Sequence, residues 1–119
     1  SSTTVVANIE NDLNITIETI EKNITKKTKE ILPVHFAGKI CNINKIKKIA
    51  KKNNLKLIED CAHGIGTREG KKHVGTFGNA GCFSFYPTKN FTTIEGGMVI
   101  TNSKHYQIDF LQENLGIMM

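Results

Sequence analysis

The sequence predicts an α/β fold built on a mainly parallel sheet. Apolar, β-rich segments alternate with segments of helical period, a pattern typical of strands joined by crossover helices. Two compact strands are predicted at residues 55–60 and 80–85, and each is followed by a loop rich in glycine and polar residues. Hydrophobic residues make up 39% and charged residues 23% of the 119 residues, which is ordinary for a folded domain and unlike a disordered chain.

The N-terminal third predicts a strand, a helix and a second strand. Residues 3–9 have the composition of a short strand, and Thr16 is placed to cap a following helix. Residues 29–36 are β-rich, with Pro33 suited to the end of a strand rather than its paired middle. The predicted helix buries three isoleucines: Ile17, Ile20 and Ile24.

A second helix is predicted after residue 41, with Asn42 or Asn44 as its cap, and it runs to about residue 53. Its apolar stripe has helical spacing and comprises Ile43, Ile46, Ile49 and Ala50. Lysines cover the other face: Lys45, Lys47, Lys48, Lys51 and Lys52. The helix therefore leads, with one face buried, into the strand at 55–60.

The second half of the chain predicts two further strands separated by long loops. Residues 61–79 hold five glycines and little periodicity, and a loop of that length is usually functional or poorly ordered. A strand at 80–85, a loop at 86–97 and a strand at 98–101 follow. Residues 103–115 then predict a helix capped by its first residue.

The positive charge could indicate nucleic-acid binding, since the chain carries a net +5 and eleven basic residues lie between Lys22 and Lys56. Arg68 is the only arginine, however, and few aromatic residues lie among the lysines to stack on bases. We interpret the charge as the solvated face of the lysine-rich helix and expect no nucleic-acid partner.

The cysteines are three in number, Cys41, Cys61 and Cys82, and they indicate reduced thiols rather than a disulfide framework. No apolar run reaches eighteen residues, and the first residues lack the basic start and apolar core of a signal peptide. We therefore expect a cytoplasmic protein that does not enter a membrane. Because the cysteines and histidines have no CxxC or HxxxH spacing, we expect no metal site.

Candidate site residues lie where the two compact strands end. Ligands of open parallel sheets bind outside the carboxyl ends of the strands. Asp60 ends one strand, Ser84 lies near the end of the other, and Lys89 follows in the next loop. An acid, a hydroxyl donor and an amine nucleophile are therefore expected to converge on one crevice.

Several segments together resemble the sugar aminotransferases of the DegT/DnrJ/EryC/StrS family: "PVHFAGKICNINKI", "LKLIEDCAHGIGT" and "GCFSFYPTKNFTTIEGG". The resemblance implies a three-layer, mainly parallel, aspartate-aminotransferase-like (type I) fold. It also implies pyridoxal 5'-phosphate as cofactor. The expected reaction is amino transfer, with glutamate as the expected donor, to a nucleotide-linked keto sugar for surface polysaccharide or amino-sugar biosynthesis. The full-length protein is expected to be a homodimer.

The resemblance also assigns a role to each site residue. Lys89 would be the catalytic lysine that forms the Schiff base with the cofactor, and Asp60 would pair with its pyridinium nitrogen. His63 would lie near the 3-hydroxyl, Ala62 would pack on the ring, and Ser84 would bind the phosphate. A carboxylate at the ring nitrogen keeps that nitrogen protonated, which makes the ring an electron sink.

Two alternatives to the aminotransferase remain open. Related family members act as sugar dehydratases with a histidine in place of the lysine, and Lys89 argues against that reaction. The other alternative is an inactive or non-catalytic piece that contributes a folding or dimer surface. We expect residues 1–119 to be a fragment of the cofactor-binding large domain, without the small C-terminal domain.

Overall fold

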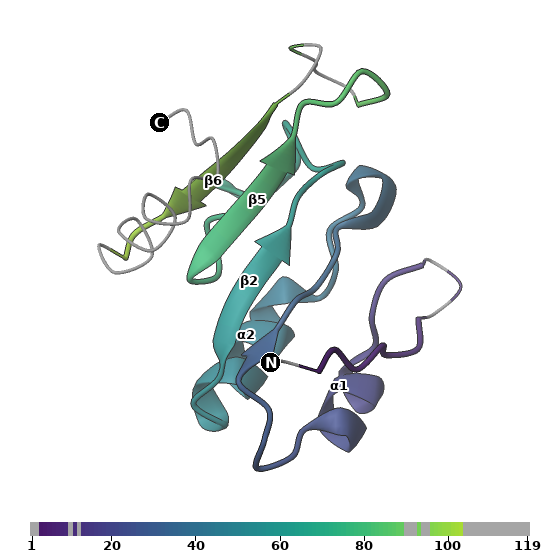
Figure 1. Ribbon diagram of the computed structural model, residues 1–119, viewed down its shortest axis with the longest axis vertical. Coiled ribbons are helices and arrows are strands. Elements are labelled where there is room, and N and C mark those ends of the chain that lie inside the picture. The colour runs from purple at the N-terminus through teal and green to yellow at the C-terminus, as the bar shows by residue number, and fades with distance from the viewer. Residues whose placement is uncertain (1–2, 10, 12, 90–92, 94–95, 104–119) are drawn as a thin grey trace.

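The computed structural model of the protein describes residues 3–9, 11, 13–89, 93 and 96–103 (Figure 1). The helix predicted over 103–115 lies outside the described residues except for its first position. In the part of the chain that the structure describes, no helix is long and apolar enough to span a membrane.

A four-stranded sheet forms the centre of the fold, in the order β1-β2-β5-β6 (Figure 1). Its strands are β1 (Glu30–Ile31), β2 (Lys56–Asp60), β5 (Ala80–Ser84) and β6 (Gly97–Thr101). The first three run parallel, as predicted, and β6 is antiparallel to β5. Antiparallel neighbours can be joined by a short connection, whereas parallel strands need a longer crossover, usually a helix.

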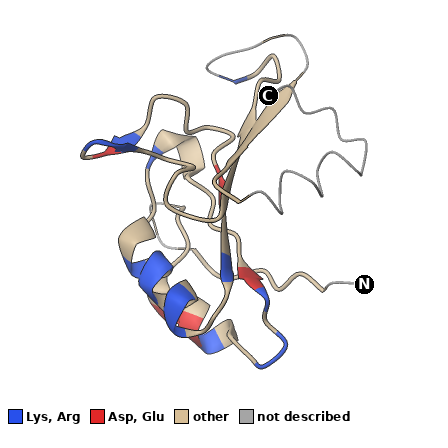
Figure 2. Cartoon of the chain, turned by 90° about the vertical axis from the view of Figure 1, so that its left-hand side faces the viewer, with Lys and Arg blue, Asp and Glu red and all other residues tan. Residues whose placement is uncertain are grey.

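Two helices lie on the same side of the sheet (Figure 2). Helix α1 (Ile17–Asn23) begins after Thr16, whose hydroxyl oxygen accepts a 3.0 Å hydrogen bond from the Thr19 N–H, so the predicted cap is confirmed. Helix α2 (Ile43–Lys52) begins after Asn42, but the Asn42 side chain makes no capping hydrogen bond.

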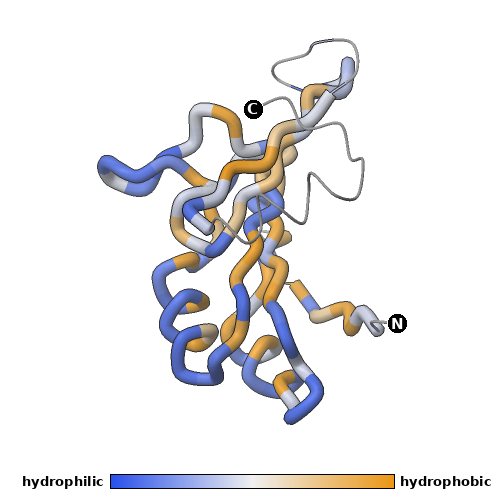
Figure 3. Tube along the Cα trace, turned by 60° about the vertical axis from the view of Figure 1, so that its left-hand side comes forward, coloured by the Kyte–Doolittle hydropathy of each residue, from blue (hydrophilic) through white to orange (hydrophobic). Residues whose placement is uncertain are grey.

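The main core lies between α2 and the sheet. The predicted apolar stripe of α2 is buried there against Leu57, Ile31 and Ile20. The lysines of the helix are exposed on its opposite face, where Figure 2 draws a run of basic residues. Figure 3 shows the same division, with apolar and polar residues alternating along the helix. The predicted amphipathic helix is therefore confirmed.

Two sequence-based expectations about secondary structure are wrong. Residues 3–8 form no strand, and residue 9 makes only an isolated bridge with Ile15. β-rich composition does not supply a pairing partner, and the valines there, Val5 and Val6, are 64% and 88% exposed. The loop at 61–79 is also less irregular than expected, because it contains a short antiparallel hairpin of β3 (Arg68–Glu69) and β4 (Lys72–His73).

The segment that follows the hairpin passes directly against β5. A Cβ added to Gly81 would clash with the backbone of Gly75, and Gly75 itself has a φ of +84°. Gly81 is required because the Gly75 backbone fills the space of a side chain, and Gly75 is required because its φ is positive and an added Cβ would lie 2.9 Å from the Phe83 ring. This close approach fixes residues 74–78 beside the strand that carries Ser84.

Candidate functional site

Asp60 and Ser84 stand at the ends of neighbouring parallel strands, as predicted. Asp60 is the last residue of β2 and pairs in register with Cys82, two residues before the end of β5. Because side chains alternate along a strand, Asp60, Cys82 and Ser84 point to the same face of the sheet. The carboxylate and the hydroxyl therefore share one face and one edge, where ligands of such sheets bind.

The Asp60 carboxylate closes the turn that follows β2. Its Oδ1 accepts a 2.9 Å hydrogen bond from the Ala62 N–H, the geometry of an Asx-turn. Within the described residues its second oxygen, Oδ2, has no hydrogen-bond partner, and the side chain is half-buried. One oxygen is thus used to hold the turn, and the other is left to meet a ligand.

Ser84 ends β5 with a similar local turn. Its Oγ accepts from the Tyr86 N–H over 3.4 Å, and its own hydroxyl proton is free to donate. The chain then turns through residues 86–89, closed by a 2.9 Å hydrogen bond from the Lys89 N–H to the Tyr86 carbonyl. This turn carries Lys89, whose side chain reaches His63 in the segment that follows β2.

The structure brings Lys89 and His63 together. Lys89 Nζ lies 2.9 Å from His63 Nε2, although the two residues are 26 positions apart. The other ring nitrogen, Nδ1, accepts a hydrogen bond of 3.3 Å from the Ala37 N–H. The Phe36 ring meets the imidazole edge-on, with the ring centroids 5.9 Å apart. Within the described residues Lys89 makes no hydrogen bond to Asp60 or Ser84.

All five predicted site residues are half-buried, neither packed in the core nor fully exposed: Asp60, Ala62, His63, Ser84 and Lys89. Such exposure suits side chains that meet a ligand from a crevice. Their roles toward a cofactor remain predictions.

Sequence reasoning missed Glu59, a fully buried carboxylate directly before Asp60. Its two oxygens accept four hydrogen bonds. Three come from backbone N–H groups at 2.7 Å, and the fourth pairs Oε2 with His35 Nε2 at 3.1 Å. Those N–H groups belong to Gly75, Phe77 and Gly78. Burial by itself would raise the pKa of Glu59, but these hydrogen bonds outweigh it, and the pKa lies below its ordinary value of 4.5.

Acid is therefore expected to destabilise the protein through Glu59. A carboxyl whose pKa is lower in the folded state contributes stability above its unfolded pKa and loses it as the pH falls through the folded value. The free energy of unfolding should thus decrease as the pH drops below 4.5. Urea unfolding measured from about pH 7 to pH 3 checks this decrease.

Glu59→Gln should remove part of that pH dependence. The amide NH₂ must face backbone or imidazole donors, and each donor left unpaired costs about 1–3 kcal/mol. Glu69→Gln, at an exposed position, is the matched control. It should leave the pH dependence of the free energy of unfolding unchanged. If the free energy of unfolding of Glu59→Gln depends on pH as it does in the parent, Glu59 is not the source of the acid sensitivity.

The side chains of His35, Glu59 and Cys61 place potential metal-ligand atoms within 4.8 Å of one another. Both Glu59 oxygens already accept hydrogen bonds, and both His35 nitrogens are engaged, by Glu59 and by the Cys41 N–H. Burial raises the pKa of the Cys61 thiol far above its ordinary value, so the thiol stays protonated. The cluster is accordingly a hydrogen-bonded network.

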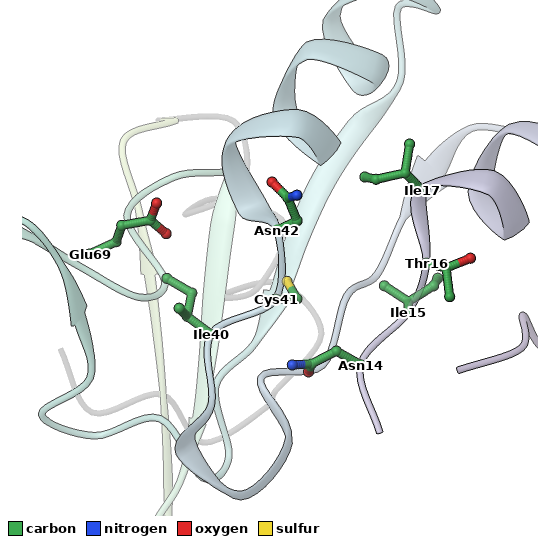
Figure 4. A pocket seen from close by; sticks show the side chains of 8 residues that line it. All are labelled: Asn14, Ile15, Thr16, Ile17, Ile40, Cys41, Asn42 and Glu69. Atoms are coloured by element: carbon green, nitrogen blue, oxygen red, sulfur yellow. The ribbon is translucent and has the colours of Figure 1, made fainter. Parts of the chain in front are cut away.

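A pocket of about 440 Å³ lies at the N-terminal end of α2. Figure 4 shows side chains from the entry to α1 on one side and from the entry to α2 on the other, with Glu69 beyond them. Its lining comprises Asn14, Ile15, Thr16, Ile17, Ile40, Cys41, Asn42 and Glu69. None of the predicted site residues lines this pocket, so it is separate from the strand ends that carry Asp60 and Ser84.

The three cysteines are free thiols, as predicted. Cys41 and Cys61 are buried, and Cys82 lies beside Asp60 in the sheet. Burial raises the pKa of the Cys82 thiol, and the Asp60 carboxylate raises it further. The thiol is therefore a neutral neighbour of the candidate site.

The mainly parallel sheet with its helices is shared with structural neighbours that are pyridoxal-phosphate-dependent aminotransferases of fold type I. The chain belongs to the DegT/DnrJ/EryC1/StrS aminotransferase family, which matches residues 1–112. The predicted family, fold type and family cofactor, pyridoxal phosphate, are confirmed.

The chain is 44% identical over 100 residues to GDP-perosamine synthase of Vibrio cholerae, covering 83% of this chain and 27% of the relative. PseC of Helicobacter pylori, an aminotransferase involved in the biosynthesis of pseudoaminic acid, is 37% identical with a TM-score of 0.84. That match covers 92% of this chain and 30% of PseC.

The third comparison is with the GDP-4-keto-6-deoxy-D-mannose-3-dehydratase of Escherichia coli, solved with bound hydrated pyridoxal phosphate. It is 34% identical with a TM-score of 0.79, over 88% of this chain and 27% of the dehydratase. The chain thus spans about a quarter of the curated relatives it matches, between 24% and 27% of their length.

Proposed function

We propose that the protein containing this chain is a pyridoxal-phosphate-dependent aminotransferase that moves an amino group to a nucleotide-linked keto sugar. The observation that carries the proposal is the 2.9 Å contact between Lys89 Nζ and His63 Nε2, beside the strand ends that hold Asp60 and Ser84. Family membership and the sugar aminotransferases among the relatives support the same reaction.

The residues present fit this cofactor. Asp60 keeps Oδ2 without a partner in the described part of the chain, so a carboxylate oxygen is available for a protonated ring nitrogen. Ser84 keeps its hydroxyl proton to donate to a phosphate oxygen. Ala62, held by the Asp60 turn, offers a small apolar surface to a ring. When bound, pyridoxal phosphate supplies an electron sink for the carbon that loses its proton.

Lys89 is assigned two tasks in this proposal. Its Nζ would hold the cofactor covalently, because an amine condenses with an aldehyde and releases water. As a free amine, Lys89 would serve as the general base and acid that moves a proton at the reacting substrate carbon. His63, in contact with Nζ, keeps the amine in place for that transfer.

The remaining features of the whole protein are also part of the proposal. We assign residues 1–119 to the cofactor-binding large domain, with a small C-terminal domain lying outside this chain. Glutamate is the proposed amino donor and a homodimer the proposed assembly. Biosynthesis of surface polysaccharide or amino sugar is the proposed context, in line with the spore coat polysaccharide protein SpsC of Bacillus subtilis among the relatives.

A sugar dehydratase is the second candidate, favoured by the similarity to the cofactor-bound dehydratase of Escherichia coli. The presence of Lys89 favours the aminotransferase instead, because a lysine amine serves both as tether and as proton carrier. Incubation with a nucleotide-linked keto sugar separates the two reactions, since only the aminotransferase incorporates nitrogen from the donor.

The test uses the longest natural polypeptide that contains these residues. Pyridoxal phosphate is added, the mixture is reduced with borohydride, and the phosphopyridoxyl group is mapped by mass spectrometry. We expect the stable label on Lys89. Label confined to exposed lysines such as Lys51 would overturn the proposal and favour a non-catalytic piece of the fold.

A further inference from the structure

Residues 35–41, called the His35 loop below, contact His63 at three points. The Ala37 N–H donates to His63 Nδ1 over 3.3 Å, and the Phe36 ring meets the imidazole edge-on. The Gly38 backbone passes so close that an added Cβ would lie 3.1 Å from the His63 carbonyl oxygen. The loop therefore determines where the imidazole stands and which of its nitrogens is engaged by the backbone.

The His35 side chain closes this loop. Its imidazole is fully buried, and Nδ1 accepts a 3.3 Å hydrogen bond from the Cys41 N–H at the far end of the loop. Because Nδ1 accepts, the proton of the neutral ring is on Nε2, which donates to Glu59 Oε2 at 3.1 Å. The His35 backbone N–H also donates to the Asp60 carbonyl at 3.0 Å. The loop is thus tied to β2 by both a side chain and the backbone.

We propose that His35 is a positioning residue for the site: by closing the His35 loop it holds His63 with Nε2 directed at Lys89. His35 acts only through His63. The inference rests on the proposed function, because it assigns a use in that reaction to the contact between His63 and Lys89.

The tautomer of His63 gives this arrangement its chemical consequence. With Nδ1 accepting from the Ala37 N–H, the proton of the neutral ring is on Nε2. Nε2 lies 2.9 Å from Lys89 Nζ, so the imidazole fixes the position of the amine nitrogen that attacks a carbonyl. Loosening the loop should therefore reduce attack by Lys89.

Two substitutions separate the two side-chain bonds of His35. In His35→Gln the amide nitrogen can still donate to Glu59, but the acceptor for the Cys41 N–H is lost. In His35→Asn the shorter side chain keeps an oxygen near the former Nδ1 and cannot reach Glu59. If His35 were merely structural, stability and reactivity would fall together. A positioning role predicts that reactivity falls in the glutamine variant and stability falls in the asparagine variant.

The measurement is the rate of borohydride-trapped labelling of Lys89 by pyridoxal phosphate, followed across a range of pH on the longest natural polypeptide. Labelling of Lys51, which is exposed on α2, is the internal standard, and urea unfolding is recorded for every variant. We expect His35→Gln to slow Lys89 labelling on the order of tenfold. This is the lower end of the loss of activity found when residues that hydrogen-bond metal-bound histidines are mutated. Lys51 labelling should not change, and His35→Asn should label Lys89 at nearly the parental rate.

A double-mutant cycle tests whether His35 acts through His63. In a His63→Ala background, His35→Gln should cause no further loss of Lys89 labelling. Two results would overturn the positioning role and leave the proposed function intact. One is that His35→Gln labels Lys89 at the parental rate. The other is that His35→Gln slows Lys89 labelling as much in the His63→Ala background as in the parent. Absence of Lys89 labelling in the parent protein overturns the proposed function and this inference with it. If His35→Gln does not fold, His35→Asn decides: parental labelling supports the role, and a tenfold loss overturns it.

Discussion

Replacing Lys89 with alanine is expected to abolish covalent attachment of pyridoxal phosphate and, with it, amino transfer. The amine is the proposed tether, and we expect no other lysine to take its place, because among the described residues Lys89 is the lysine whose amine contacts His63. Loss of the proton carrier by itself accounts for a decrease of roughly 10²–10⁴-fold in rate. Absorbance of the bound cofactor and nitrogen transfer from labelled glutamate to a keto sugar nucleotide measure the two effects.

The matched control for this substitution is Lys51→Ala, at an exposed position on α2. It should change neither cofactor attachment nor turnover. Because Lys89 is half-buried in a loop, Lys89→Ala should shift the free energy of unfolding by only about 0.5 kcal/mol, so a folded, inactive variant is the expected product. Amino transfer persisting in Lys89→Ala would contradict the assigned role.

Asp60→Asn is expected to produce the second large loss of turnover. Asparagine keeps an oxygen that accepts from the Ala62 N–H, so the turn after β2 survives and only the negative charge is lost. A neutral partner no longer stabilises a protonated ring nitrogen, and the electron sink weakens. Removing one preorganised electrostatic partner from an active site commonly lowers turnover by about 10²–10³-fold.

This variant should still attach the cofactor to Lys89, which separates it from Lys89→Ala. The measurement is turnover in parallel with borohydride mapping of the label. Asp60→Ala is the comparison, because it removes both the charge and the turn hydrogen bond and should also lower stability. Turnover of Asp60→Asn equal to that of the parent would show that the carboxylate has no electrostatic role.

The sequence predicted the strands that carry the site because local patterns decide them. The apolar runs before Asp60 and before Ser84 are bounded by polar loops, and β2 and β5 end at those two residues. The strand predicted at residues 3–9 was wrong because strand formation also needs a partner, which local composition does not report.

The Glu59 network was missed because it depends on contacts between distant segments. His35 lies 24 positions from Glu59, and the three N–H donors lie 16 to 19 positions away in a loop. One local signal was present: alternation along β2 puts Glu59 on the same face as buried Leu57, so its burial could have been anticipated. Its partners could not, because only the folded loops bring them together.

The two adjacent acids of β2 have different positions: Glu59 belongs to the buried network, and Asp60 belongs to the candidate site. Glu59 faces the interior, where it joins two loops to the sheet, and Asp60 faces the opposite side, where it has an oxygen to offer a ligand. An insertion or deletion of one residue within β2 would exchange their faces. Engineering of this site should therefore vary the chain by substitution at the ligand-facing positions, and treat the length of β2 as fixed.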